Sequence, residues 1–221
     1  MKLVRYGAKG KELPGIIDND GKLRSLAGLV NEESEQFLSD KGLAELGRMN
    51  LSKLPLVPGK PRFGCPVANV SKFVAIGLNY TDHAKETNSP IPKEPIIFMK
   101  ALNCLQGPND NVMLPRGSVK TDWEVELGIV ISKKTRYVTK ENALDHVAGY
   151  VLVNDVSERE FQAERGPQWD KGKGCDTFGP VGPYLVTRDE VEDPQNLELW
   201  LDVNGKRMQT GNTKTMIFPV K

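Results

Sequence analysis

One stretch of the sequence, Lys120 to Ile131, constrains the fold more than any other. Apolar and non-apolar residues alternate along it, which is the period of a β-strand with one buried face. The apolar face, which we expect to enter a core, consists of Trp123, Val125, Leu127, Ile129 and Ile131. The opposite face carries Asp122, Glu124 and Glu126, followed by Gly128 and Val130.

Glu124 and Glu126 point the same way from this strand, about 7 Å apart at about 3.3 Å of rise per residue. Two neighbouring carboxylates repel each other unless water or a cation screens them. One interpretation is a solvated strand face. The other is half of a metal site with oxygen ligands, because this face continues with glycine and valine instead of staying polar. Glycine in a strand often marks close approach by another backbone or a ligand.

Size and composition exclude several classes of protein. The chain has 221 residues and a net charge of +1, from 30 basic and 29 acidic side chains. This balance gives no electrostatic reason to expect nucleic acid or a membrane surface as a partner. The first residues lack the apolar stretch of a signal peptide, and no run is long enough to span a membrane. Three cysteines without CxxC spacing fit a reducing compartment, so we expect a cytoplasmic protein.

The pattern divides the chain into a small N-terminal module with a linker, residues 1–65, and a larger domain, residues 66–221. The module shows short strands at Lys2–Tyr6 and Gly15–Asp18, and a third strand is expected from Leu23 to Leu29. A weak helical period follows over Asn31–Leu46, and a Pro- and Gly-rich linker over Leu54–Pro66. The module carries no catalytic constellation, so we expect a structural role for it.

The larger domain is predicted to be mainly β. Its expected strands, besides the one described above, are Val70–Ile76, Pro95–Lys100, Val147–Val153 and a hairpin of Leu197–Val203 with Arg207–Gln209. With the helical period of the module, the fold class is α+β.

His83 and Glu86 form a candidate catalytic pair. They are three residues apart on a short helical turn that Thr81 or Asp82 can cap, so they face each other. A carboxylate beside an imidazole orients its tautomer and raises its basicity, as in a dyad that activates water. The alternative is an ordinary surface pair. The second histidine, His146, has no comparable partner in the sequence.

Three further polar residues follow strands or occupy a loop. Lys100 ends a short strand, where its side chain could reach an anionic ligand or lie in solvent. Ser157 and Glu160 fit a capping box for a helix, which leaves Asp155 at a strand end without an obvious structural role. Lys173 lies in the glycine-rich loop 169–180, where it could meet a carboxylate or enolate.

Two other functions for this part of the chain find no support in the sequence. The glycine-rich loop does not fit the nucleotide P-loop pattern, and no strand–loop–helix frame surrounds it. A nucleophilic pair of Cys175 and His83 has no sequence support either.

Taken in order, these motifs resemble the fumarylacetoacetate hydrolase family. They are Gly77-Leu78-Asn79-Tyr80 with His83 and Glu86, then Asp122-Trp123-Glu124-Val125-Glu126-Leu127-Gly128, Asn154-Asp155 and Lys171-Gly172-Lys173. The similarity runs from about Lys72 to the last residue. The module and the phrase from Trp169 to Pro180 look closest to a branch of 2,4-diketo-3-deoxy-sugar-acid hydrolases, many of whose relatives carry the label ureidoglycolate lyase.

The resemblance implies a catalytic domain that is a mixed, mainly β, sandwich-like roll, usually in homodimers. It implies one divalent cation, Mg²⁺ or Mn²⁺, held by Glu124, Glu126 and Asp155. It further implies that His83 and Glu86 activate water, and that Lys173 contacts the substrate or its enolate. Asn79, Tyr80 and Lys100 are expected at the substrate.

The resemblance leads to an expected reaction: metal-dependent hydrolysis of a carbon–carbon bond in a 2,4-diketo acid, which yields pyruvate and a second acid. The same metal site would suit ureidoglycolate cleavage or oxaloacetate decarboxylation. Family members continue for several tens of residues past Lys221, with a Gly-Thr-rich stretch that helps to bind substrate. We therefore also consider an inactive binding protein, truncated at its C-terminal end.

Overall fold

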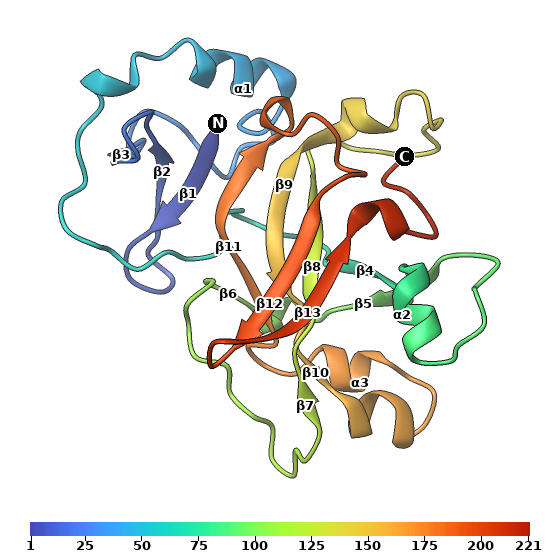
Figure 1. Ribbon diagram of the computed structural model, residues 1–221. Helices are drawn as coiled ribbons and strands as arrows, with labels where there is room; N and C mark the ends of the chain where they lie inside the picture. The colour runs from blue at the N-terminus through green and yellow to red at the C-terminus, as the bar shows by residue number, and fades with distance from the viewer.

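The computed structural model describes residues 1–221 and consists mostly of strands, with few and short helices (Figure 1). The strands are β1 (Lys2–Tyr6), β2 (Leu13–Ile17), β3 (Leu23–Ser25), β4 (Val74–Gly77), β5 (Ile96–Met99), β6 (Leu105–Gln106), β7 (Thr121–Asp122), β8 (Val125–Ile131), β9 (Val147–Asn154), β10 (Ser157–Glu158), β11 (Gly179–Thr187), β12 (Glu198–Val203) and β13 (Lys206–Asn212). The α-helices are α1 (Asp40–Gly47), α2 (Thr81–Glu86) and α3 (Asp170–Lys173). Single turns of other helix types are η1 (Leu51–Lys53), η2 (Leu102–Cys104), η3 (Ala143–His146), the π-helical η4 (Glu160–Glu164), η5 (Arg188–Glu190) and η6 (Thr213–Thr215).

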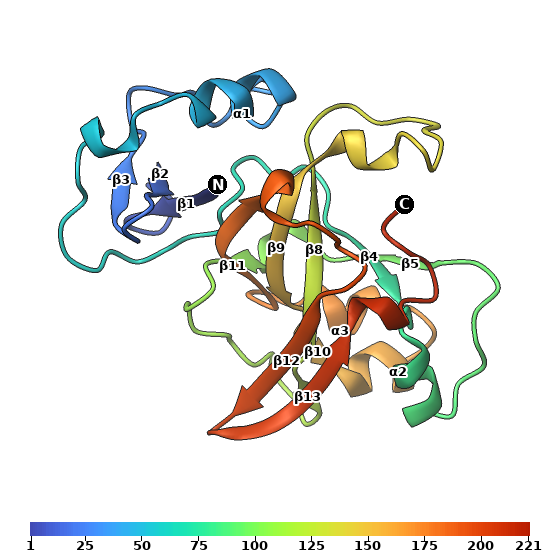
Figure 2. The same cartoon turned by 45° about the horizontal axis from the view of Figure 1, so that its top comes forward.

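A seven-stranded sheet organises the molecule. Its strands run in the order β3-β2-β1-β11-β9-β8, and β6 pairs with β11 beside this path. Three two-stranded sheets surround it: β4 with β5, β7 with β10, and β12 with β13. Figure 2 shows α2 on the side of β8 away from β1–β3, and the β12–β13 hairpin below β8. The α+β, mainly β, fold class expected from the sequence is confirmed.

The N-terminal strands join the main sheet. Strand β1 pairs antiparallel with β11, with Leu3 opposite Leu185. Both side chains are almost completely buried in one core cluster, together with Ile16 and with Val151 and Val153 of β9. The first 65 residues and the larger domain therefore share apolar packing, and the boundary expected near Cys65 stays a prediction.

Local sequence signals located several strands, missed β11 of the main sheet, and placed the first helix poorly. Strand β1 has the expected bounds, and the hairpin of β12 and β13 forms as expected. The third strand is shorter than expected and stops at Ser25. The helical period over Asn31–Leu46 yields a helix only from Asp40, where Ser39 caps the first turn.

Strand β8 buries the face opposite to the one expected. Gly128 and Val130 point to the core, because β9 presents Val151 and Val153 on that side. The strand needs glycine at 128 because a Cβ there would lie 2.5 Å from Val151 Cγ2. On the other face Ile129 and Ile131 are 37% and 54% exposed. The prediction that the apolar stripe enters the core is therefore wrong.

No helix of this structure combines the length and the apolar character needed to cross a lipid bilayer.

Candidate active site

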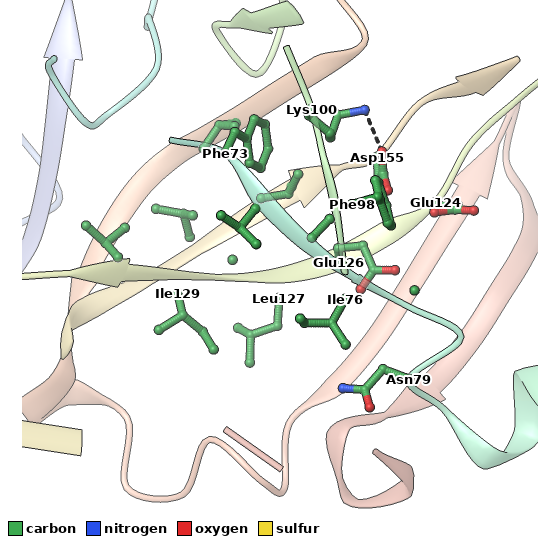
Figure 3. A pocket seen from close by; sticks show the side chains of 18 of the residues that line it. Phe73, Ile76, Asn79, Phe98, Lys100, Glu124, Glu126, Leu127, Ile129 and Asp155 are labelled. Atoms are coloured by element: carbon green, nitrogen blue, oxygen red, sulfur yellow. Dashed lines mark hydrogen bonds and ion pairs between the residues drawn. The ribbon is translucent and has the colours of Figure 1, made fainter. Parts of the chain in front are cut away.

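A large open pocket brings together most of the polar residues singled out from the sequence. Its lining includes Glu124, Glu126 and Asp155, as well as His83 and Lys173. Glu124 lies in the link before β8, Glu126 in β8 and Asp155 directly after β9, while His83 lies in α2 and Lys173 in α3. Figure 3 shows the three carboxyl groups along the pocket, with Lys100 on the other side of Asp155 from Glu126.

The backbone holds two of the carboxylates at a fixed separation. The link between β7 and β8 carries Glu124, whose N–H donates to Asn154 Oδ1 at 3.1 Å. In return, the Asp155 N–H donates to the Glu124 carbonyl oxygen at 2.8 Å. The ends of β8 and β9 are thus tied together where the acidic side chains leave the sheet.

Most of the charged groups form a continuous chain of ion pairs. Lys173 Nζ lies 2.6 Å from Glu124 Oε2 and 2.9 Å from Asp155 Oδ2. The second oxygen of Glu124 lies 2.6 Å from Arg159 Nη1, and Arg159 Nη2 lies 2.7 Å from Asp122 Oδ2. Each of these acids therefore has at least one cation as its partner.

Glu126 is the exception in this cluster. Burial, followed by the charges of Glu124 and Asp155, raises the pKa of Glu126 to about 8 against the opposing effect of Lys173. No hydrogen bond contributes to this shift. A carboxylate that lines a pocket without a donor is free to bind a ligand, because its oxygen lone pairs are not used by the protein.

The structure corrects the expectation for Lys100. Its side chain is 1% exposed, and Nζ lies 2.5 Å from Asp155 Oδ1. Nζ also donates to the carbonyl oxygens of Val156 and Lys173. An ammonium group has three hydrogens, so protein oxygens accept all of them. Lys100 therefore does not lie in solvent, and this geometry favours an orienting role for Asp155 over contact with substrate.

The capping box expected after Asp155 does not form. Ser157 lies in β10, and its hydroxyl donates to the Asp155 carbonyl oxygen at 2.8 Å. The helical turn that follows begins at Glu160, and no side chain caps it. Asp155 itself is 5% exposed, and Lys100 and Lys173 hold its two oxygens. It therefore has the structural partners that the sequence did not reveal.

His83 and Glu86 meet on α2 as predicted from their spacing. Glu86 Oε2 lies 3.7 Å from His83 Nδ1, and both side chains reach solvent, with 46% and 81% of their surface exposed. The helix begins after Tyr80 without a side-chain cap, so the capping expected of Thr81 or Asp82 is wrong. Both side chains line the same pocket as the carboxylates. Their catalytic role stays a prediction.

Asn79 and Tyr80 differ in whether the protein already pairs their side-chain hydrogen-bonding groups. The Asn79 amide is paired with the backbone of Phe218, accepting from its N–H at 2.8 Å and donating to its carbonyl oxygen at 2.9 Å. The Tyr80 hydroxyl, by contrast, is buried without a hydrogen-bond partner. Burial, followed by the charges of Glu126 and Asp82, raises its pKa, so this hydroxyl stays protonated. Tyr80 is thus the better placed of the two to bind substrate.

Two groups that support the site could not be predicted from sequence patterns. Arg159 bridges Asp122 and Glu124, although it lies 35 residues beyond Glu124 in the chain. The rings of Phe98 and Trp169 meet edge to face at 5.7 Å, and Lys173 Nζ lies 5.2 Å from the centre of the Phe98 ring. Such contacts depend on how strands pair, and no local spacing encodes them.

The donor set suits a divalent cation. Glu124, Glu126 and Asp155 provide carboxylate oxygens, which Mg²⁺ and Mn²⁺ prefer as ligands, and Glu126 has no competing partner. In the conformation described, these side chains are not gathered as a metal site, and the Lys173 ammonium lies between Glu124 and Asp155. A bound cation would have to share these two carboxylates with Lys173.

The sequence and the structure of this chain resemble those of known proteins. The family model described as "Fumarylacetoacetate (FAA) hydrolase C-terminal" matches residues 72–221. The chain belongs to the fumarylacetoacetate hydrolase family. A Burkholderia lata protein, named only as a hydrolase, is 59% identical over 220 residues, which cover 100% of this chain and 78% of that protein.

Two solved structures resemble the whole chain. The maleylpyruvate hydrolase of Sphingobium sp. SYK-6, solved with manganese(II) and pyruvate, is 27% identical, with a TM-score of 0.80 over 100% of this chain and 80% of that one. A 2-hydroxyhepta-2,4-diene-1,7-dioate isomerase from Mycobacterium marinum is 32% identical, with a TM-score of 0.75 over 100% and 78%. This chain is therefore an enzyme of the family, with activity of the hydrolase or isomerase type.

Proposed function

We propose that this enzyme uses a divalent metal to hydrolyse the C3–C4 bond of a 2,4-diketo acid, with pyruvate and a second acid as products. The observation that carries the proposal is Glu126, a pocket carboxyl group without a hydrogen-bond partner, close enough to Glu124 and Asp155 for their charges to raise its pKa. The manganese and pyruvate of the Sphingobium structure support the same chemistry.

Glu124, Glu126 and Asp155 would hold Mg²⁺ or Mn²⁺. When bound, the cation supplies a Lewis acid that withdraws electron density from the 2-keto acid end of the substrate. The Tyr80 hydroxyl, buried and unpaired, would donate to an oxygen of the same substrate. Arg159 would keep Glu124 in place through the ion pair at 2.6 Å.

His83 would act as the general base. The Glu86 carboxylate, 3.7 Å from Nδ1, favours the tautomer with hydrogen on Nδ1 and leaves Nε2 free to accept a proton. Nε2 then takes a proton from water, whose oxygen bonds to C4 of the substrate. As the C3–C4 bond breaks, its electron pair passes to C3, and the proton that His83 carries is delivered there. The products are a carboxylic acid and pyruvate.

Lys173 would stabilise the negative charge that develops on the pyruvate side. Its side chain is 3% exposed, and its ammonium group lies at the carboxylates that would hold the cation. A fixed positive charge in a water-poor site stabilises a developing enolate more than it stabilises the neutral ketone. We expect loss of Lys173 to lower kcat more than it changes KM.

Cytoplasmic localisation and homodimers belong to the same proposal. The three cysteines are free thiols in the structure, which fits a reducing compartment. Light scattering coupled to gel filtration tests the dimer, and a monomer mass at micromolar concentration would refute it.

The decisive experiment measures pyruvate released from a 2,4-diketo-3-deoxy acid with Mn²⁺ or Mg²⁺ present. We expect release by the wild-type chain, loss of at least about a thousandfold in Glu124→Ala/Glu126→Ala, and a comparable loss in His83→Ala with metal binding retained. Ureidoglycolate and oxaloacetate are assayed in parallel. Turnover of either one without pyruvate release from the diketo acid would replace the proposed reaction, and near-native kcat in His83→Ala would exclude the dyad.

A further inference from the structure

Helix α3, which carries Lys173, is only one turn long. It spans Asp170–Lys173, and its two closing N–H groups, those of Gly172 and Lys173, donate to the Trp169 carbonyl oxygen at 3.0 and 3.2 Å. A helix this short has no stability of its own, since nucleation costs more than one turn of hydrogen bonds returns. Its position must therefore come from contacts with the rest of the protein.

One of these contacts is made by the Trp169 ring. The ring lies against the backbone of β4 at Gly77, where a Cβ would come within 2.3 Å of Trp169 Cζ3. The same ring meets Phe98 of β5 edge to face at 5.7 Å. Because β4 and β5 pair with each other, Gly77 and Phe98 form one rigid seat for the ring.

The residues that hold the Trp169 ring also lie close to Lys173. The Phe98 ring contacts Trp169 on one side, and its centre lies 5.2 Å from Lys173 Nζ. Asp170, next to Trp169, accepts a hydrogen bond from the Met99 N–H at 3.2 Å, which ties the start of α3 to the end of β5. A shift of the Trp169 ring would therefore move the turn and the ammonium group at its end.

We propose that Trp169 is a positioning residue: its ring, seated on Gly77 and Phe98, fixes α3 so that the Lys173 ammonium stays between Glu124 and Asp155. The inference rests on the proposed function for the catalytic role of Lys173. The placement of Lys173 itself depends only on the contacts described above. Gly77 is glycine because any side chain there would displace the ring.

The contact can be broken from either side. Gly77→Ala adds a methyl group where the Trp169 ring lies and alters no charged residue; Gly77 is in a strand and lacks a positive φ, so its backbone accepts alanine. Trp169→Leu removes the ring without adding atoms at Gly77. The double variant Gly77→Ala/Trp169→Leu has room for the new methyl group. Gly47→Ala is the control, because a Cβ there meets nothing within 4 Å.

Kinetics of pyruvate release give the first measurement. We expect Gly77→Ala to lower kcat about ten- to a hundredfold with KM changed less than about threefold, because Lys173 acts in the transition state. Trp169→Phe should keep most of the activity, and the double variant should be no worse than Trp169→Leu alone. Losses that multiply in the double variant, or a kcat of Gly77→Ala within twofold of wild type, would overturn the proposal.

Amine labelling gives a second measurement that needs no activity. Reductive methylation followed by peptide mass mapping should leave Lys173 unmodified in the wild type, where its side chain is 3% exposed. Lys173 should become modified in Gly77→Ala and Trp169→Leu, while exposed Lys171 is modified in every variant. Lys173 protected in both variants would overturn the positioning role. If wild type releases no pyruvate but the labelling changes as expected, the proposed function fails and the positioning role stands.

Discussion

Glu158 and Glu126 differ in the hydrogen bonds that their carboxyl groups accept from the protein: Glu158 accepts several, and Glu126 accepts none. Glu158 of β10 is 0% exposed and accepts hydrogen bonds from the Lys120 N–H at 3.1 Å, from Thr121 Oγ1 at 3.1 Å and from the Glu160 N–H at 3.2 Å. The Ser118 hydroxyl also donates to it. Glu126 lines the pocket and has none of these donors.

The pKa values follow this difference. Burial raises the pKa of Glu158, but the hydrogen bonds from Ser118, Lys120, Thr121 and Glu160 outweigh it, and the result is a lowered pKa. For Glu126, burial and the neighbouring acids act without opposition from any hydrogen bond, and its pKa rises to about 8. A carboxylate with a structural role accepts hydrogen bonds from protein donors, whereas a pocket carboxylate without donors indicates a site for a ligand.

The largest expected effect is the loss of stability when Glu158 is replaced. Glu158→Leu removes the acceptor of two half-buried backbone N–H groups, those of Lys120 and Glu160, and of the Ser118 and Thr121 hydroxyls, which keep only their hydrogen bond to each other. We expect a loss of about 3 kcal/mol or more in the free energy of unfolding, since each orphaned buried donor costs about 1–3 kcal/mol. Urea unfolding followed by circular dichroism measures it. A loss below about 1 kcal/mol would mean that the hydrogen bonds around Glu158 add little.

A matched pair of amide substitutions compares how much Glu124 and Glu126 contribute to stability. In metal-free protein, Glu124→Gln removes the charge that pairs with Arg159 and Lys173, and we expect a loss of about 2 kcal/mol. Glu126→Gln replaces a carboxyl group that its raised pKa keeps mostly protonated at pH 7 and that no hydrogen bond holds, so stability should stay within about 0.5 kcal/mol or increase. Urea unfolding with a chelator present compares the two. A loss in Glu126→Gln as large as in Glu124→Gln would remove the distinction.

The smallest effect is the pH dependence that Glu158 contributes. Its folded pKa lies below the ordinary 4.5, so its stabilisation is fully present above pH 4.5 and is lost as the pH falls through the folded value. The urea midpoints of wild type and Glu158→Gln should therefore differ at pH 6 and approach each other between pH 4.5 and pH 3. A constant difference over that range would contradict the lowered pKa.

Sequence patterns located the elements of the site better than its contacts. The strand alternation predicted that Glu124 and Glu126 share a site, and both line the pocket; the i,i+3 spacing brought His83 to Glu86, as the structure has them. Alternation alone defines two faces of β8 and does not say which is buried. Strand β9 settles that with Val151 and Val153, which pack on the Gly128 face of β8. The position of β9 depends in turn on β11, its other neighbour in the sheet, which follows only after η4 and α3.

Local sequence patterns could not predict the ion-pair partners of the charged residues, for a similar reason. Lys100 meets Asp155 over 55 positions of sequence, and Arg159 meets Asp122 over 37. Ser157 had a plausible capping partner three residues later, but pairing of β10 with β7 took it into a strand. In each case a long-range contact decided between outcomes that spacing left open.

The proposed metal site depends on Glu126 as a ligand, and calorimetric titration with Mn²⁺ tests this role most directly. Wild type, Glu126→Gln and Glu158→Gln are titrated side by side, with the Glu158 variant as the control for loss of a buried glutamate. We expect one Mn²⁺ to bind per chain, at least about tenfold weaker binding in Glu126→Gln, and unchanged binding in Glu158→Gln. Equal affinity of wild type and Glu126→Gln would contradict the metal site and the function built on it.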